Sequence, residues 1–123
     1  MTRTKHTGPL LVVDDDTVAR DGLSEFLSDE GFRVHVAANG IEALVYFDQH
    51  RHALVITDLE MPHMDGRALI AALRTRAPVP LILVLTAQMA IDAEREAEYL
   101  GVDAYVNKPI DLDVMLRHVH ALM

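Results

Sequence analysis

The chain has 123 residues, of which 50% are hydrophobic, and these values predict one compact domain spanning residues 1–123. It contains no cysteine, which excludes disulfides, thiolate-bound zinc and thiol nucleophiles. The formal net charge is −8, from 11 basic and 19 acidic residues, and no local basic patch opposes it. Direct binding of nucleic acid by this domain is therefore not expected.

The chain opens on a basic and polar stretch, residues 1–8, which we expect to be a flexible extension of the domain. The apolar run after it, Leu10 to Val13, is too short for the core of a signal peptide. No segment approaches the length of a membrane span, so we expect no association with a membrane. Together with the absence of cysteine, this pattern favours a cytoplasmic protein.

Short apolar runs alternate along the chain with longer stretches of helical period, and five such pairs can be counted. This alternation is typical of βαβ units around a mostly parallel sheet. We expect strands at Leu10–Asp14, Arg33–Ala37, Ala53–Thr57, Leu81–Thr86 and Ala104–Val106. The second strand alternates polar and apolar residues, which suits an edge with one partly exposed face, whereas the others suit a sheet covered on both faces.

Apolar residues at helical spacing predict which face of each helix packs inward. They are Val18, Leu23, Phe26 and Leu27 in the first helix, Ile41, Leu44 and Val45 in the second, Leu69, Ile70 and Leu73 in the third, and Leu112, Met115, Leu116 and Val119 in the last. The fourth helix, about residues 90–100, is expected to be lightly anchored because three of its inward candidates are alanines. These candidates are Ala90, Ala93, Ala97 and Leu100.

The predicted architecture is an α/β fold, a doubly wound (βα)5 domain around a five-stranded parallel sheet. A strand order of 2-1-3-4-5 places the second strand at an edge and makes the chain reverse direction between strands one and three. Ligands of such sheets bind at that reversal point, at the carboxyl ends of the strands.

Carboxylates follow both strands that flank the reversal point. Strand one ends in Asp14-Asp15-Asp16, and strand three is followed by Asp58. Such carboxylates repel one another unless a hard cation joins them, and Mg²⁺ takes oxygen ligands of this kind. A helix N-cap followed by acids of the first turn is the plainer explanation of the triple aspartate, and it is sufficient for Asp16. For the others the sequence predicts a Mg²⁺ site.

A hydroxyl and an ammonium are expected at the same edge of the sheet, because Thr86 ends strand four and Lys108 follows strand five. Each alone is a weak signal, since a strand-end threonine is usually a cap and a lysine usually a solvated charge. Together with the acids they supply an aspartate nucleophile, a metal, a charge that neutralises phosphate and a hydroxyl that bonds a phosphoryl oxygen.

Four spans, VVDDD, ITDLEMPHMDG, LTA and GVDAYVNKP, occur in the order and spacing of bacterial response-regulator receivers, and the resemblance covers essentially the whole chain. It implies a flavodoxin-like fold, similar to the chemotaxis regulators of two-component signalling. It also implies a switch rather than a turnover enzyme: Asp58 resembles the phosphoacceptor, which takes a phosphoryl group from a histidine kinase or histidine phosphotransfer protein with Mg²⁺ as cofactor.

The same resemblance assigns roles residue by residue. The implied Mg²⁺ ligands are Asp15, Asp58, the Glu60 backbone carbonyl and, through water, Asp14. The implied phosphate-binding and switch residues are Thr86, Ala87, Tyr105 and Lys108, and the Lys108–Pro109 bond resembles the family's cis peptide. The residues that border the water's line of attack, and so affect the lifetime of the phosphorylated state, are Glu60 and Gln88. Met61-Pro62 and Asp65-Gly66 fit the turn after the phosphoacceptor.

The family implies an output face formed by helix four, strand five and helix five, which contacts a downstream effector or a fused output domain and allows a phosphorylation-dependent dimer. The winged-helix transcription-factor subfamily usually carries Asp-Asp-Tyr near strand five and Phe after Lys-Pro. This chain has Asp103-Ala104-Tyr105 and Ile110 instead, which leaves the type of output open.

Two other functions are compatible with parts of the sequence. The run from Asp14 to Val18 also fits the nucleophile motif of haloacid-dehalogenase phosphatases, but residues 109–123 leave no room for that family's acidic metal motif, and Asp58 stays unexplained. A receiver-like interaction domain that no longer takes phosphate usually lacks an acid or the lysine, whereas this chain keeps both.

The seven histidines do not predict a metal site. His118 and His120 lie two apart on a helix and do not share a face, and His50 and His52 flank a loop. The usual spacings of histidine metal motifs are absent.

Overall fold

The computed structural model describes residues 8–61 and 63–123, so most of the predicted N-terminal extension, and Pro62, lie outside the described residues. The strands are β1 (Leu10–Val13), β2 (Val34–Ala37), β3 (Leu54–Asp58), β4 (Leu81–Thr86) and β5 (Ala104–Asn107). The helices are α1 (Thr17–Asp29), α2 (Gly40–His50), α3 (Gly66–Leu73), α4 (Ala90–Leu100) and α5 (Leu112–Leu122). The predicted bounds are correct for β4 and α4 and differ by one residue at the ends of the other strands.

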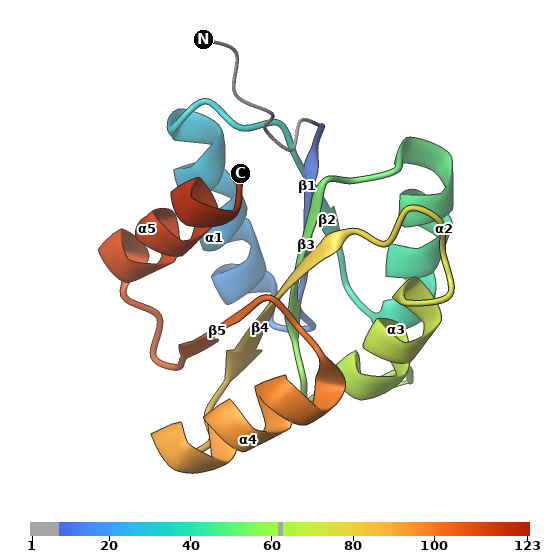
Figure 1. Cartoon of the computed structure of the whole chain (residues 1–123). Coiled ribbons are helices and arrows are strands. Elements are labelled where there is room, and N and C mark those ends of the chain that lie inside the picture. The colour runs from blue at the N-terminus through green and yellow to red at the C-terminus, as the bar shows by residue number, and fades with distance from the viewer. Residues whose placement is uncertain (1–7, 62) are drawn as a thin grey trace, which may run out of the picture.

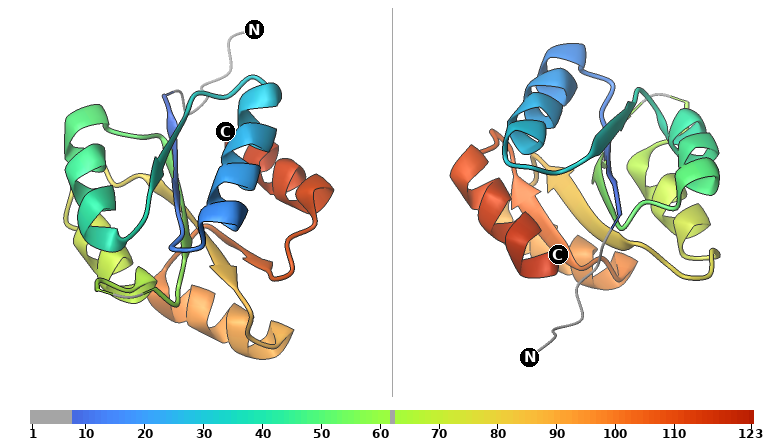
Figure 2. Two further views of the ribbon diagram at one scale, coloured as in Figure 1. Left: turned by 180° about the vertical axis from the view of Figure 1, so that it is seen from behind. Right: turned by 90° about the horizontal axis from the view of Figure 1, so that it is seen from above.

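The strands form one sheet in the order β2-β1-β3-β4-β5, and every pair of neighbours is parallel. Helices cover both faces: α1 and α5 lie on one side, and α2 and α3 on the other (Figure 1). The view from above in Figure 2 shows the same two layers of helix around the sheet. The predicted doubly wound fold and strand order are therefore confirmed. Among the described residues, no helix combines the length and apolar character needed to cross a bilayer.

Successive residues of a strand point to opposite faces of the sheet, so alternate residues pack into two hydrophobic clusters, one on each face. Leu11, Val13 and Val55 point toward the cluster of α2 and α3, which Leu100 of α4 also contacts. Leu10, Val12 and Leu54 point toward the cluster of α1 and α5. Burying each of these side chains contributes about 1.5–3 kcal/mol, so both faces of the sheet hold the strand ends in fixed positions.

The predicted inward faces are correct for α3, where Leu69, Ile70 and Leu73 are buried, but wrong in part for α1 and α2. Val18 is 83% exposed, and it lies in the first turn of α1, two residues after the N-cap Asp16. Ile41 and Val45 are also exposed.

The helix α2 packs through Ala43 and Phe47 instead, one turn apart on the face toward the sheet, with Leu44 only partly buried. In α5, Met115 and Val119 are buried as predicted, while Leu112 is 41% exposed in the first turn.

The light anchoring expected of α4 is confirmed, because Ala93 is its only buried residue. Ala97 and Leu100 are half-buried, and Ala90 is exposed, so the prediction that Ala90 packs inward was wrong. Ala90 is the first residue of the helix, and the N-cap Met89 makes no side-chain capping bond there.

The predicted edge position of β2 and its partial exposure are confirmed, but partial exposure is not confined to one face, since Val34, His35 and Val36 are all half-buried. His35 is covered because its Nδ1 lies 2.8 Å from Nε2 of the buried His52, and the His50 ring lies beside it.

Candidate functional site

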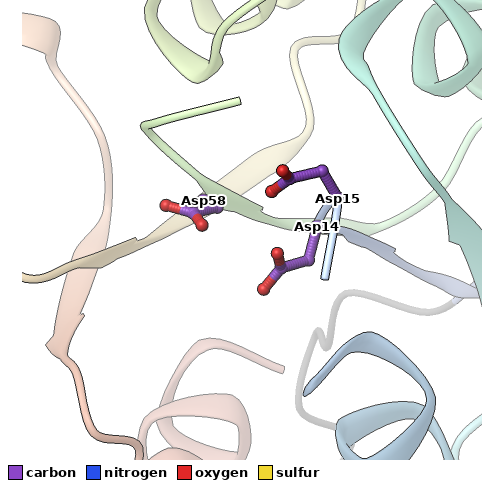
Figure 3. Close-up of side chains that lie close together, drawn as sticks. All are labelled: Asp14, Asp15 and Asp58. Atoms are coloured by element: carbon purple, nitrogen blue, oxygen red, sulfur yellow. The ribbon is translucent and has the colours of Figure 1, made fainter. Parts of the chain in front are cut away.

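Three carboxylates meet at the carboxyl ends of the two central strands. Asp14 and Asp15 follow β1, Asp58 ends the adjacent β3, and their oxygens lie within 4.8 Å of one another. Figure 3 shows the three side chains gathered beside these strand ends. Asp14 and Asp58 are 1% and 6% exposed, whereas Asp15 faces solvent. Because two of the acids are buried, their mutual repulsion needs compensation by positive charge.

Lys108 supplies one such charge. Its Nζ lies 2.6 Å from Asp58 Oδ2 and 3.8 Å from Asp14 Oδ2. The lysine follows β5, its peptide with Pro109 is cis, and its own N–H donates to the Thr86 carbonyl at 2.8 Å. Lys108 is fifty positions from Asp58 in the sequence, but it lies in the same crevice because β5 pairs with β4, which pairs with β3.

The surroundings shift the pKa values of two of these groups, Asp14 and Lys108. Burial raises the pKa of Asp14 above its usual value, against the opposing effects of the Asp16 N–H and the charge on Lys108. Burial acts to lower the pKa of Lys108, but the hydrogen bond to Asp58 and the nearby carboxylates outweigh it, so that pKa is raised. Lys108 therefore stays charged at neutral pH, and a further cation would favour the ionised form of Asp14.

The Thr86 hydroxyl lies at the end of β4 and is 4% exposed. Its Oγ1 accepts a hydrogen bond of 3.1 Å from the Gln88 N–H, across the exposed Ala87. Asn107 donates to the Gln88 carbonyl at 2.8 Å, which ties this turn to the end of β5. The hydroxyl is therefore held by the turn that leads into α4.

The loop after Asp58 is fixed by a close approach at Gly66, the first residue of α3. A Cβ atom at this position would clash with the Asp58 carbonyl oxygen and would lie 2.7 Å from Leu59 Cα. The Gly66 N–H donates to the Leu59 carbonyl at 2.9 Å, and Asp65 caps α3 by accepting from the Ala68 N–H. Only glycine fits here, as the turn chemistry of the sequence predicted.

An ion-pair network at the rim of the crevice was not predicted from the sequence. Arg67 of α3 bonds both Glu60 and Glu96, and Glu96 also accepts from Gln88. Arg67 and Glu96 are separated by 29 residues and belong to different helices, so no local spacing relates them.

A groove of about 720 Å³ runs along α4, β5 and α5, away from the three aspartates. Tyr105, Ala97 and Val114 are among its apolar lining, and Tyr105 is half-buried there. Four acids also line it: Glu94, Glu98, Asp103 and Asp111. The face that the sequence predicts to carry the output is thus hollowed and acidic.

Residues 10–120 match the family model of the response regulator receiver domain. The chain is 36% identical over 114 residues to the response regulator MprA of Mycobacterium sp. (strain KMS), covering 93% of this chain and 50% of that protein. The MprA of Mycobacterium ulcerans is 35% identical, with 93% of this chain and 49% of that protein covered. The chain thus spans about half the length of these curated relatives.

Similar solved structures are also response regulators. The chemotaxis response regulator CheY4 of Vibrio cholerae superposes with a TM-score of 0.87 at 28% identity, covering 95% of this chain and 99% of that one. A putative response regulator from Chloroflexus aurantiacus gives 0.87 at 31% identity, covering 94% and 96%. The chain belongs to the response regulator receiver family and is a receiver domain of the two-component type.

Proposed function

We propose that this receiver domain is a phosphorylation switch in which Asp58 accepts a phosphoryl group from a phosphohistidine of a sensor kinase or phosphotransfer protein. The observation that carries the proposal is the position of Asp58: a buried carboxylate at a strand end, 2.6 Å from the Lys108 ammonium and grouped with Asp14 and Asp15. Family membership supports the same chemistry.

In the proposed transfer an Asp58 oxygen attacks phosphorus in line, the bond from phosphorus to the histidine nitrogen breaks, and its electron pair stays on the imidazole. Lys108 lies where it can offset the charge on the transferring group. The partner supplies the activated phosphate, so the domain acts as a switch and not as a turnover enzyme.

The three carboxylates fit a hard divalent cation, because their oxygens converge and two of the acids are shielded from water. We propose Asp15, Asp58 and the Glu60 carbonyl as ligands of Mg²⁺, with Asp14 acting through water. When bound, Mg²⁺ supplies positive charge next to the phosphoryl oxygens.

We propose that the conformational change starts at Thr86. Its hydroxyl leaves the Gln88 N–H and turns toward the phosphoryl oxygen, next to the Ala87 backbone, and this favours a second arrangement of α4 and of Tyr105 on β5. The groove between α4, β5 and α5 then serves a downstream effector or a fused output domain. The MprA relatives, twice as long as the matched region, have room for such a domain.

A phosphate-trapping experiment tests the proposal. The protein is incubated with Mg²⁺ and a small phosphodonor, and the acyl phosphate is located by mass spectrometry of peptides. We expect label on Asp58 and none in Asp58→Asn, because an amide is not a nucleophile of this kind. Asp16→Asn, at the exposed N-cap, is the control and should be labelled normally.

The same experiment separates the alternatives. Label on Asp14 would indicate the phosphatase chemistry of the haloacid-dehalogenase type, and absence of label in the wild type would indicate a receiver-like interaction domain. Either result would reject the switch.

A further inference from the structure

The helices α3 and α4 are joined by a two-pronged ion pair. The Arg67 guanidinium bonds both carboxylate oxygens of Glu96, through Nε to Oε2 and through Nη2 to Oε1 at 2.8 Å. The two side chains are 34% and 19% exposed. An arginine that meets a carboxylate with two parallel bonds fixes orientation as well as distance.

Each end of this pair reaches the phosphoacceptor crevice. Arg67 Nη1 donates to Glu60 Oε1 at 3.2 Å, and the Glu60 N–H donates to Asp58 Oδ1 at 3.2 Å. On the other side Gln88 Nε2 donates to Glu96 Oε1 at 2.8 Å.

The Gln88 N–H donates in turn to Thr86 Oγ1. An unbroken series of hydrogen bonds therefore leads from the phosphoacceptor to the switch hydroxyl around the outside of the crevice.

Few apolar contacts hold α4 in place. Ala93 is its only buried residue, and Ile91 and Tyr99 are 61% and 89% exposed. An alanine buries little apolar area compared with the leucines of α3, so the polar contacts of α4 carry a larger share of its anchoring.

We propose that Arg67 and Glu96 form a clasp that restrains α4 in the unphosphorylated protein and releases it together with Thr86. The hydroxyl cannot turn away without losing the Gln88 N–H, and Gln88 cannot follow it without losing Glu96. Arg67 and Glu96 are positioning residues, since they act through Gln88 and Glu60. The link to phosphorylation rests on the proposed function, whereas the restraint is a property of the unmodified chain.

Amide hydrogen exchange of the unmodified protein tests the restraint directly. In Arg67→Ala and in Glu96→Ala we expect the amides of residues 93–100 to exchange about two- to fivefold faster, the effect of losing a partly exposed ion pair. The double variant should be no faster than Glu96→Ala, because Arg67 is bonded to α4 through Glu96. Arg67→Lys should recover part of the protection.

A matched control exists on the other side of α3. Arg76 bonds both oxygens of Asp48 on α2, at 3.1 and 2.9 Å, so Arg76→Ala removes a similar pair that does not touch α4. Its α4 amides should exchange as in the wild type. Unchanged α4 exchange in Arg67→Ala, or the same acceleration in Arg76→Ala, would overturn the clasp.

Phosphorylation gives an independent readout. If the clasp holds both Glu60 and Gln88 beside the crevice, Arg67→Ala and Glu96→Ala should both change the dephosphorylation rate of labelled Asp58 in the same direction, with Arg76→Ala unchanged. Changes in opposite directions, or no change in either variant, would contradict a shared action. Failure of the wild type to accept label would reject the proposed function, while the exchange experiment would still decide on the clasp.

Discussion

The ammonium of Lys108 contacts Asp58 at 2.6 Å and faces Asp14 at 3.8 Å, so a single side-chain cation serves both buried carboxylates. A Mg²⁺ ion bound by the same carboxylates would lie near this ammonium. The two cations would then repel each other while both stabilised the same anions.

Removing the Lys108 ammonium should raise the affinity for Mg²⁺ and slow phosphoryl transfer to Asp58. We expect Lys108→Met to bind Mg²⁺ about threefold more tightly or better, since one nearby positive charge is lost. The rate of labelling at Asp58 should fall, because the charge on the phosphoryl group is no longer offset. Isothermal titration measures the first effect and phosphate trapping the second. Arg117→Met, on the exposed side of α5, should change neither, and weaker Mg²⁺ binding in Lys108→Met would contradict the expectation.

Asp15 and Asp16 are adjacent but lie in different surroundings, since Asp15 belongs to the carboxylate cluster and Asp16 caps α1, which makes them a matched pair of variants. Asp15→Ala should weaken Mg²⁺ binding sharply, because it removes a carboxylate from the cluster. Asp16→Ala should leave Mg²⁺ binding unchanged and cost about 1 kcal/mol of stability, because Asp16 accepts from the Val18 and Ala19 N–H groups as N-cap of α1. Amide shifts on Mg²⁺ titration and urea unfolding separate the two effects, and equal loss of metal binding in both variants would argue against the cluster.

Thr86→Ala should separate phosphorylation from its consequence. The variant keeps Asp58 and Lys108 and should be labelled, but it lacks the hydroxyl that accepts from the Gln88 N–H. With beryllofluoride as an acyl-phosphate mimic, the amide signals of residues 87–100 and 104–106 should shift in the wild type and much less in the variant. Signals at the far end of α1 should move little in either protein. Wild-type shifts confined to the carboxylate cluster would mean that α4 does not respond.

The histidine pair at β2 predicts an acid-sensitive fold. Burial lowers the pKa of His52 from 6.5 to about 4, and the charges of His35 and His50 act in the same direction. Between these values the unfolded chain binds the proton more readily than the folded one, so stability is lost as pH falls through that window, by at most about 3 kcal/mol. Urea unfolding across the window should show a shallower pH slope in His52→Gln. His120→Gln, at an exposed position, should keep the wild-type slope.

Much of the sheet could be predicted because its signals are local. β1, β3 and β4 are continuous apolar runs, which predict buried strands. Acids follow β1 and end β3, Thr86 ends β4 and Lys108 follows β5, so these polar residues predict the edge of the sheet where the site lies. Topology then brings Lys108 to Asp58 without any further information.

The inward faces of the helices and the contacts between helices were harder to predict from the sequence. Ile41 and Val45 lie four residues apart, as Ala43 and Phe47 do, so apolar spacing alone offers two possible inward faces for α2, and the structure buries the second. Contacts such as Arg67 with Glu96 depend on how two helices lie against each other, which no spacing along the chain encodes.

The close approach at Gly66 has a mechanical consequence. The first residue of α3 touches the backbone of Asp58 and Leu59 without room for a methyl group, so the start of α3 has little space to shift toward the end of β3. Across the crevice α4 has one buried alanine and a polar contact that can open. If phosphorylation strains the backbone at Asp58, α3 is therefore expected to resist the strain and α4 to yield to it. The direction of the response would then follow from packing that exists before any phosphate is bound.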